Sequence, residues 1–312
     1  MIHSLNLNST QDLVFRASSL DPGKVQRASA LLCYPGGKGS NVARTAALLG
    51  GRARLVALAA RQDLAGTRAF FARQGLAAVL VPVPGKARPC VIVHDARRDL
   101  ETVLNSPSTV RPGAAHLATL TRRLLERLKP GDLVTLSGTL PASLPPDSFA
   151  SLIRRVRARG GLAILDSSGP FLRLGLKAGP FLVKPNLEEL EELSGRRLRS
   201  AAALKAAARG LARRGARFVC VSLGGRGALL AGRDSLFHVP ALRPGPGPHS
   251  PIGCGDAFVG GLAYGLSRGE GLTGALRWAT ASGWANLHHF GAAFMAASEV
   301  REAVGRVEIR KA

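Results

Sequence analysis

Short apolar segments that end in small or polar residues recur along this chain of 312 residues, from about residue 53 onward. They are 54–60 (RLVALAA), 132–138 (DLVTLSG), 161–169 (GLAILDSSG), 180–186 (PFLVKPN) and 217–225 (RFVCVSLGG). Continuously apolar segments of this length suit strands covered on both faces, as in a parallel sheet. Helical patterns lie between them at 114–128, 147–158, 186–194 and 200–214. The alternation predicts an α/β fold, doubly wound, with a mostly parallel central sheet and helices on both faces.

Two other regions, 10–35 and 87–104, show short alternating strands with no helix between them. Each is too short to fold alone, and a small sheet needs cover for its second face. We therefore expect one domain over 1–312, in which these two segments form a small β-sheet that acts as a lid over a site or as a subunit contact. Because ligands of open parallel sheets bind beyond the carboxyl ends of the strands, the polar strand ends are the places to search.

The formal charge of +23 raises the alternative of a basic nucleic-acid-associated protein. The arginines are spread along the whole sequence, however, and aromatic residues make up only 5% of it, which leaves little surface for base stacking. We expect an anionic substrate and no specific nucleic acid. No segment has the roughly 18 apolar residues of a membrane span, and "MIHSLNLNST" does not resemble a signal peptide. Four widely separated cysteines predict free thiols in the cytoplasm.

The segment "PIGCGDAFVGGLAYGL" at 251–266 places two glycines and an acid in front of a helical pattern. One interpretation is a helix capped by Asp256 or carrying it as a first-turn acid. The other is an anion site, in which free N–H groups at the helix start bind phosphate oxygens and Asp256 serves as a base. These residues alone leave both open.

Two further segments allow a structural and a functional interpretation. In "PGGKGSNVARTAALLG" at 35–50, Asn41 either caps the helix or, with Lys38, contacts hydroxyls or a phosphate. In "VKPNLEEL" at 183–190, the first-turn acids complement the helix dipole. Alternatively, Asn186 and Glu189 lie on one helix face and hold a hydrated Mg²⁺.

Taken in order, Asp12 and then "GGKGSN", "SGTLP", "DSSG", "VKPNLEEL", "SLGGRGA" and "GCGDAFVGG" resemble the ribokinase-like (PfkB) sugar kinases. The likeness extends from about Leu5 to the last helix, and within the family it is similar to the phosphofructokinase and tagatose-phosphate kinase branch. The resemblance implies an ATP-dependent sugar-phosphate kinase that uses Mg²⁺ and forms a homodimer through the lid sheet. Fructose 1-phosphate, converted to fructose 1,6-bisphosphate, is the first choice of substrate. Tagatose 6-phosphate and fructose 6-phosphate stay open.

The resemblance also implies a role for individual positions. Asp256 matches the catalytic base, and the anion hole matches Gly253, Cys254 and Gly255. Magnesium is organised by Asn186, Glu189 and Asp166, through water. The sugar phosphate is contacted by Asp12, Lys24, Gly37, Lys38, Asn41, Arg88 and Thr139. The nucleotide side comprises Lys184, Asn186, Ser222, Gly224 and Gly227, with Asn286 in the adenine pocket.

This sequence departs from the family pattern at four of these motifs. Ser9 replaces a proline near the start, Thr139 a serine and Pro251 a threonine. Cys254 replaces an alanine between the two glycines, and its larger side chain is expected to crowd the anion hole.

Overall fold

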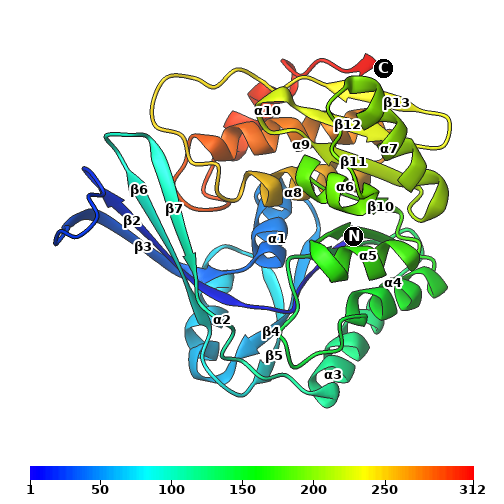
Figure 1. Ribbon diagram of the computed structural model, residues 1–312. Helices are drawn as coiled ribbons and strands as arrows, with labels where there is room; N and C mark the ends of the chain where they lie inside the picture. The colour runs from blue at the N-terminus through cyan, green and yellow to red at the C-terminus, as the bar shows by residue number, and fades with distance from the viewer.

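The computed structural model describes residues 1–312 and contains one large and one small β-sheet (Figure 1). The large sheet has the strand order β14-β13-β12-β11-β10-β9-β8-β1-β4-β5. Its strands are β1 (Ile2–Asn6), β4 (Ala53–Ala60), β5 (Ala77–Val83), β8 (Leu133–Ser137), β9 (Leu162–Asp166), β10 (Leu182–Val183), β11 (Phe218–Ser222), β12 (Ala228–Ala231), β13 (Leu236–Val239) and β14 (Arg310–Lys311). The strands from β5 to β11 in that order run parallel, and the three at the other edge are antiparallel. The predicted doubly wound, mostly parallel sheet is confirmed.

Helices cover both faces of the large sheet, because its strands bury apolar side chains on both sides. Neighbouring residues of β8 illustrate this, since Leu133 packs into one apolar cluster and Val134 into the other. The Leu133 side is covered by α1 (Lys38–Leu48), α8 (Cys254–Ser267), α9 (Gly271–Leu287) and α10 (Ala297–Val304). The Val134 side is covered by α3 (Ala114–Leu125), α4 (Ser148–Ala158), α5 (Gly169–Lys177), α6 (Leu187–Ser194) and α7 (Ala201–Arg214). Helix α2 (Leu64–Arg73) packs through Phe71 against β4 and the edge strand β5.

Strand β1 occupies the middle of the large sheet, a strand that the apolar-segment pattern did not identify. Its sequence, IHSLN, is half polar, yet all five residues are buried. Tertiary partners satisfy the polar groups: Ser4 donates a hydrogen bond of 2.7 Å to the Gly39 carbonyl, and Asn6 donates one of 3.1 Å to the Gly36 carbonyl. The polar side chains of Ser4 and Asn6 therefore serve to hold the backbone around the start of α1.

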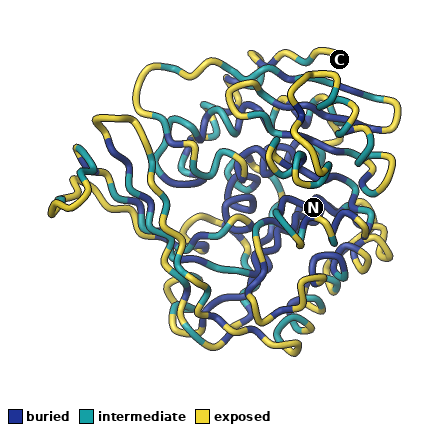
Figure 2. Tube along the Cα trace, viewed as in Figure 1, coloured by how far each residue is buried: buried dark blue, intermediate teal, exposed yellow.

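The small sheet has the order β3-β2-β6-β7 and comes from the two segments predicted for it. Its strands are β2 (Thr10–Ala17), β3 (Ala28–Gly36), β6 (Arg88–Asp95) and β7 (Leu100–Asn105). In Figure 1 the small sheet extends away from the rest of the molecule. Figure 2 shows that most of its residues are exposed or half-buried. One face contacts the body through Val14, Tyr34 and Ile92, which pack against Phe290 and Phe294.

No helix of the structure combines the length and the apolar character that a membrane crossing requires.

Candidate active site

Helix α8 begins at a turn with unused backbone donors. Gly253, the N-cap residue, has φ 79°, and a side chain there would collide with Ala292. The backbone amides of Gly253, Gly255 and Asp256 donate no hydrogen bond within the protein. The Cys254 amide, which was also predicted for the anion hole, instead donates to the Pro251 carbonyl at 3.3 Å. Free N–H groups at the positive end of a helix dipole attract an anion, so this turn is suited to hold phosphate oxygens.

Asp256 lies in the first turn of α8 and is only 6% exposed. It makes no capping hydrogen bond, so the interpretation of this residue as an N-cap is wrong. Its carboxylate instead accepts a hydrogen bond of 2.8 Å from the Asn41 side chain, which also rules out Asn41 as the cap of α1. Burial raises the pKa of Asp256 to about 6, although the positive charge of Lys38 acts in the opposite direction. A carboxyl group with this pKa is suited to accept a proton near neutral pH.

Two lysines and an aspartate lie next to this carboxylate. Lys184 follows β10 and forms an ion pair of 3.0 Å with Asp166 at the end of β9, and both are almost fully buried. A side chain at Gly255 would come within 3.9 Å of the Lys184 amine, which places that amine beside the anion turn. Lys38 is exposed at the start of α1, and the negative charges of Asp166 and Asp256 raise its pKa. Both cations therefore converge on the open turn.

Asn186 and Glu189 form a reciprocal capping box at the start of α6. The Glu189 amide donates to the Asn186 side chain, and the Asn186 amide donates to the Glu189 carboxylate, each at 2.8 Å. Glu188 and Glu189 lie in the first turn of α6, as the structural interpretation predicted, whereas the capping box itself was not predicted. It leaves Glu189 Oε1 without a hydrogen-bond partner, and Asp166 Oδ2 is buried and equally unpartnered. Burial raises the pKa of Glu189.

The glycine turn after β11 lies next to this capping box. Ser222 forms an isolated parallel β-bridge with Asn186 at the carboxyl edge of the sheet. The chain then turns through Gly224–Arg226, and Gly227 follows with φ 91°. A side chain at Gly227 would collide with the Val239 carbonyl, so glycine is required there. Ser222 thus lies beside Asn186, at the start of the turn that contains Gly224 and Gly227.

The small sheet brings Asp12 and Arg88 to the other side of the site. Asp12 is 6% exposed and accepts a hydrogen bond of 2.5 Å from the Thr10 hydroxyl. Burial raises its pKa, and the neighbouring charge of Arg88 lowers it. The Arg88 guanidinium donates to the Asn105 side chain (3.2 Å) and to the Ser106 carbonyl (3.0 Å). These two contacts fix the direction of the arginine.

Gly37 and Thr139 lie near Lys38. Gly37 is the N-cap of α1 with φ 103°, and a side chain there would come within 2.5 Å of the Asn6 amide nitrogen. Thr139 is exposed and accepts a hydrogen bond of 3.0 Å from Asn8. Its neighbour Gly138 packs beside the Lys38 stem, so the predicted sugar-side residues share one region.

Lys24 is exposed in the loop between β2 and β3, at the end of the hairpin opposite to Thr10, roughly 25 Å away along an eight-residue strand, and its contact with the sugar phosphate stays a prediction. Two other sequence-based assignments do not agree with the structure. Asn286 is fully buried, and its side chain bonds the Ile252 carbonyl and the Ala293 amide, so it offers no polar atom to an adenine. Cys254 directs its thiol toward the Ser250 carbonyl and Asn286, and it does not crowd the anion hole.

No sequence pattern indicates the role of Arg44, which orders the neighbouring loop. This arginine on α1 is 3% exposed and donates to the carbonyls of Ala292 (2.8 Å) and Ala293 (3.1 Å). Its guanidinium also lies 4.5 Å from the centre of the Phe294 ring. The loop that it holds carries Ala292, against which Gly253 packs. A lone arginine in a helical pattern gives no signal for such a role, since the loop carbonyls that it binds lie about 250 residues away.

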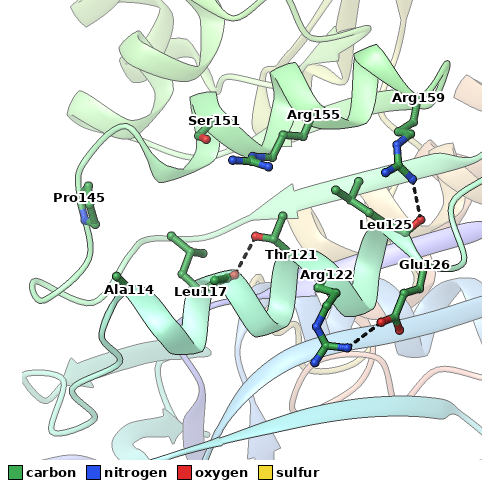
Figure 3. A pocket seen from close by; sticks show the side chains of 11 residues that line it. Ala114, Leu117, Thr121, Arg122, Leu125, Glu126, Pro145, Ser151, Arg155 and Arg159 are labelled. Atoms are coloured by element: carbon green, nitrogen blue, oxygen red, sulfur yellow. Dashed lines mark hydrogen bonds and ion pairs between the residues drawn. The ribbon is translucent and has the colours of Figure 1, made fainter.

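A groove of about 500 Å³ lies between α3 and α4, apart from these residues (Figure 3). Its wall contains the ion pair between Arg122 and Glu126, and Arg159 reaches the Leu125 carbonyl. None of the predicted site residues lines it.

An anion-binding turn beside a buried base is the arrangement that suits phosphoryl transfer to a hydroxyl, on an α/β fold with ligand sites at strand ends. The model of the pfkB family carbohydrate kinases matches residues 6–299. The chain belongs to this family and is an ATP-dependent phosphotransferase.

Relatives and solved structures agree with this assignment. The chain is 36% identical to the 1-phosphofructokinase of Rhodobacter capsulatus over 282 residues, which cover 90% of this chain and 88% of the relative. It is 35% identical to that of Xanthomonas campestris pv. campestris, with 98% and 97% covered. Phosphofructokinase-2 from Escherichia coli in complex with substrates and products superimposes with a TM-score of 0.90 at 27% identity, covering 98% of each chain. The nucleic-acid alternative is not favoured.

Proposed function

We propose that this protein is a 1-phosphofructokinase, which transfers the terminal phosphoryl group of ATP to the 6-hydroxyl of fructose 1-phosphate. The observation that carries the proposal is the pairing of Asp256 with the unused amides of the turn in which it lies. The choice of sugar is supported by the curated relatives at 30–36% identity, all described as 1-phosphofructokinases. They favour this substrate over tagatose 6-phosphate or fructose 6-phosphate.

Asp256 would accept the proton of the attacking hydroxyl. Its pKa of about 6 keeps it ionised at neutral pH while leaving it basic enough to take up a proton. The hydrogen bond from Asn41 fixes one carboxylate oxygen, so the other is left to face the sugar. Orientation of a base and its acceptor is a large part of catalysis in phosphoryl transfer.

The amides of the anion turn, together with Lys38 and Lys184, would bind the transferred phosphoryl group. Donors that are fixed before the reaction need no reorganisation, and removal of one such donor costs on the order of 10²-fold in rate. Lys184 is held by Asp166, and it is therefore already in place before the nucleotide binds. The nucleotide would extend from this turn toward Ser222, Gly224 and Gly227.

The residues present fit a hydrated Mg²⁺. Asp166 Oδ2 and Glu189 Oε1 are carboxylate oxygens without protein partners, and Asn186 lies beside them. No group of three or more His, Cys, Asp or Glu side chains forms a metal cage, which suits an ion that keeps several waters. When bound, Mg²⁺ neutralises charge on the nucleotide phosphates.

The sugar phosphate would bind between α1 and the small sheet. Asp12 and Asn41 are buried polar groups that suit sugar hydroxyls, and the anchored Arg88 suits the phosphate that the sugar already carries. We also propose that the reaction takes place in the cytoplasm, which would keep the four free thiols reduced.

The outer face of the small sheet would bind a second copy of the chain. Strand register places Leu13, Phe15, Leu31, Val91, Val93 and Leu104 on this face. Leu31 and Leu104 are 53% and 60% exposed, and a sheet with an open apolar face needs cover. A homodimer through the lid would supply it.

ADP release with each of the three ketose phosphates, measured with Mg²⁺ and with EDTA, tests the proposal. We expect kcat/KM for fructose 1-phosphate to exceed the other two values by about tenfold or more, and activity to vanish with EDTA. A preference for either 6-phosphate would overturn the choice of substrate.

A further inference from the structure

The turn between β6 and β7 contacts the loop that leads into the anion turn. Asp99, in this turn, accepts a hydrogen bond of 3.0 Å from the His249 backbone amide through Oδ1. The His249 ring lies 3.4 Å from Asp99 Oδ2. The two residues are 150 positions apart, and Gly253 follows His249 by only four residues. A residue of the lid is thus attached to the segment that presents the phosphate-binding amides.

Asp99 is held in a backbone conformation that few residues adopt. Its φ is 49°, and Asp is among the residues that tolerate the left-handed region at modest cost. The turn is braced from within, because Asp95 accepts hydrogen bonds from the amides of Arg97 (3.0 Å) and Arg98 (3.1 Å). Asp99 therefore directs its carboxylate at His249 from a turn whose backbone is held by hydrogen bonds.

The loop on the other side is equally well anchored. The His249 ring lies 3.0 Å from the Gly245 carbonyl, and the Gly245 amide donates to the His288 ring at 2.9 Å. The Ser250 amide donates to the Leu287 carbonyl at 2.7 Å. Helix α9 thus holds one side of this loop, and Asp99 is the residue of the lid that hydrogen-bonds to it. Glu101, on the same hairpin, faces Ser250 without a hydrogen bond, and Ile252 packs against the apolar inner face of the lid.

We propose that Asp99 is a positioning residue for the phosphate-binding turn, through which the lid and this turn are held together. The inference rests on the proposed kinase activity, and it adds a residue that does not touch either substrate. With Asp99 in place, the lid stays against the site and water is excluded while the phosphoryl group is transferred. Without it, the lid separates more often, and ATP is hydrolysed without a sugar acceptor.

The ion pair itself is partly exposed, with 41% of the Asp99 side chain and 28% of the His249 side chain accessible, so its charge contributes little. We therefore assign the attachment of the lid to the phosphate-binding turn to the hydrogen bond that Asp99 accepts from the His249 amide. Asp99→Gly removes this bond and accepts the positive φ without strain. Asp99→Asn keeps an acceptor for the amide and loses only the charge. Arg97→Ala, which breaks the exposed pair with Asp21 on the same hairpin, is the matched control.

Two measurements test the proposal in the full-length enzyme. The first is hydrogen exchange of a peptide covering 249–256 without substrates, which we expect to be faster by roughly two- to tenfold in Asp99→Gly. The second is the ratio of ATP hydrolysis without sugar to sugar phosphorylation, which we expect to rise by about fivefold. Asp99→Asn and Arg97→Ala should leave both quantities near the wild-type value.

Unchanged exchange and an unchanged ratio in Asp99→Gly would overturn the proposal. So would faster exchange without a change in the ratio, because Asp99 would then be merely structural. A changed ratio with unchanged exchange would show that Asp99 does not act through the turn, which also overturns it. The exchange measurement needs no substrate, so failure of the wild-type enzyme to phosphorylate fructose 1-phosphate would overturn only the proposed function.

Discussion

The carboxyl edge of the large sheet and the small sheet contribute differently to this site. At the edge, Asp166 ends β9 and Lys184 follows β10, and Asp256 lies beside them in the first turn of α8; all three are buried with fixed partners. The small sheet is covered on one face and supplies Asp12 and Arg88. We propose that the rigid edge, with the start of α8, provides the chemistry, while the lid provides selectivity for the sugar and exclusion of water.

The largest effect should come from the rigid edge, at Asp256. We expect Asp256→Asn to lower kcat by about 10³-fold or more, since it removes the base. The pKa of this carboxyl is raised in the folded protein, so its ionised form costs stability above pH 6. At pH 8 the melting temperature of Asp256→Asn should therefore equal or exceed that of the wild type. A variant that keeps kcat within tenfold of the wild type would remove Asp256 from the mechanism.

The anion turn tests the same region without altering a charge. Gly255→Ala would add a methyl group on the open side, 3.9 Å from the Lys184 amine. We expect kcat/KM for ATP to fall by about 10²-fold, because phosphate oxygens are kept away from the amides. Gly66→Ala on α2, where a side chain meets no neighbour, is the control and should have wild-type kinetics. Equal kinetics for both variants would exclude phosphate binding at this turn.

A substitution of Arg88 tests whether the lid binds the sugar phosphate and not the nucleotide. Loss of a charge-assisted contact to phosphate in Arg88→Ala should raise KM for fructose 1-phosphate by about ten- to 100-fold. KM for ATP should change by less than about twofold. Lys86→Ala, an exposed cation near the start of the same strand, serves as the control. Equal increases in both KM values would contradict the division between lid and edge.

The smallest effect on catalysis should come from the outer face of the lid. The double variant Leu31→Asp, Leu104→Asp puts charges on the open apolar face and should convert a dimer to a monomer in light scattering. We expect kcat to change by less than about fivefold, because neither residue faces the site. A wild-type protein that is monomeric at micromolar concentration would refute the proposed interface.

Several parts of the fold could be predicted because their signals are local. The apolar segments at 54–60, 132–138 and 217–225 correspond to β4, β8 and β11, since a strand covered on both faces must be apolar throughout. The two segments without helices form the small sheet, because their short alternating strands are also a local pattern in the sequence. Strand β1 carries no such local signal, because its polar side chains are satisfied only by distant partners.

The sequence predicted many of the residues that form the site, but it did not predict which residues contact one another there. Glycine turns, the acid at 256 and the lysines carry recognisable patterns, and the structure brings them together. The carboxylate that Asn41 binds and the loop carbonyls that Arg44 binds lie more than 200 residues away, and no local pattern encodes them. Asn286 was misassigned for the same reason, since a buried structural amide and a ligand contact look alike in a sequence.

The pH dependence of kcat in the wild type and in Asn41→Ser tests the central claim most directly. Asp256 must be ionised to accept a proton, so kcat should fall below a pKa near 6. The Asn41 hydrogen bond lowers this pKa, and its loss should move the acidic limb to higher pH. A phosphate group of the substrate also titrates near pH 6, but its pKa does not depend on Asn41. An acidic limb at the same pH in both enzymes would contradict the role of Asp256 as the base.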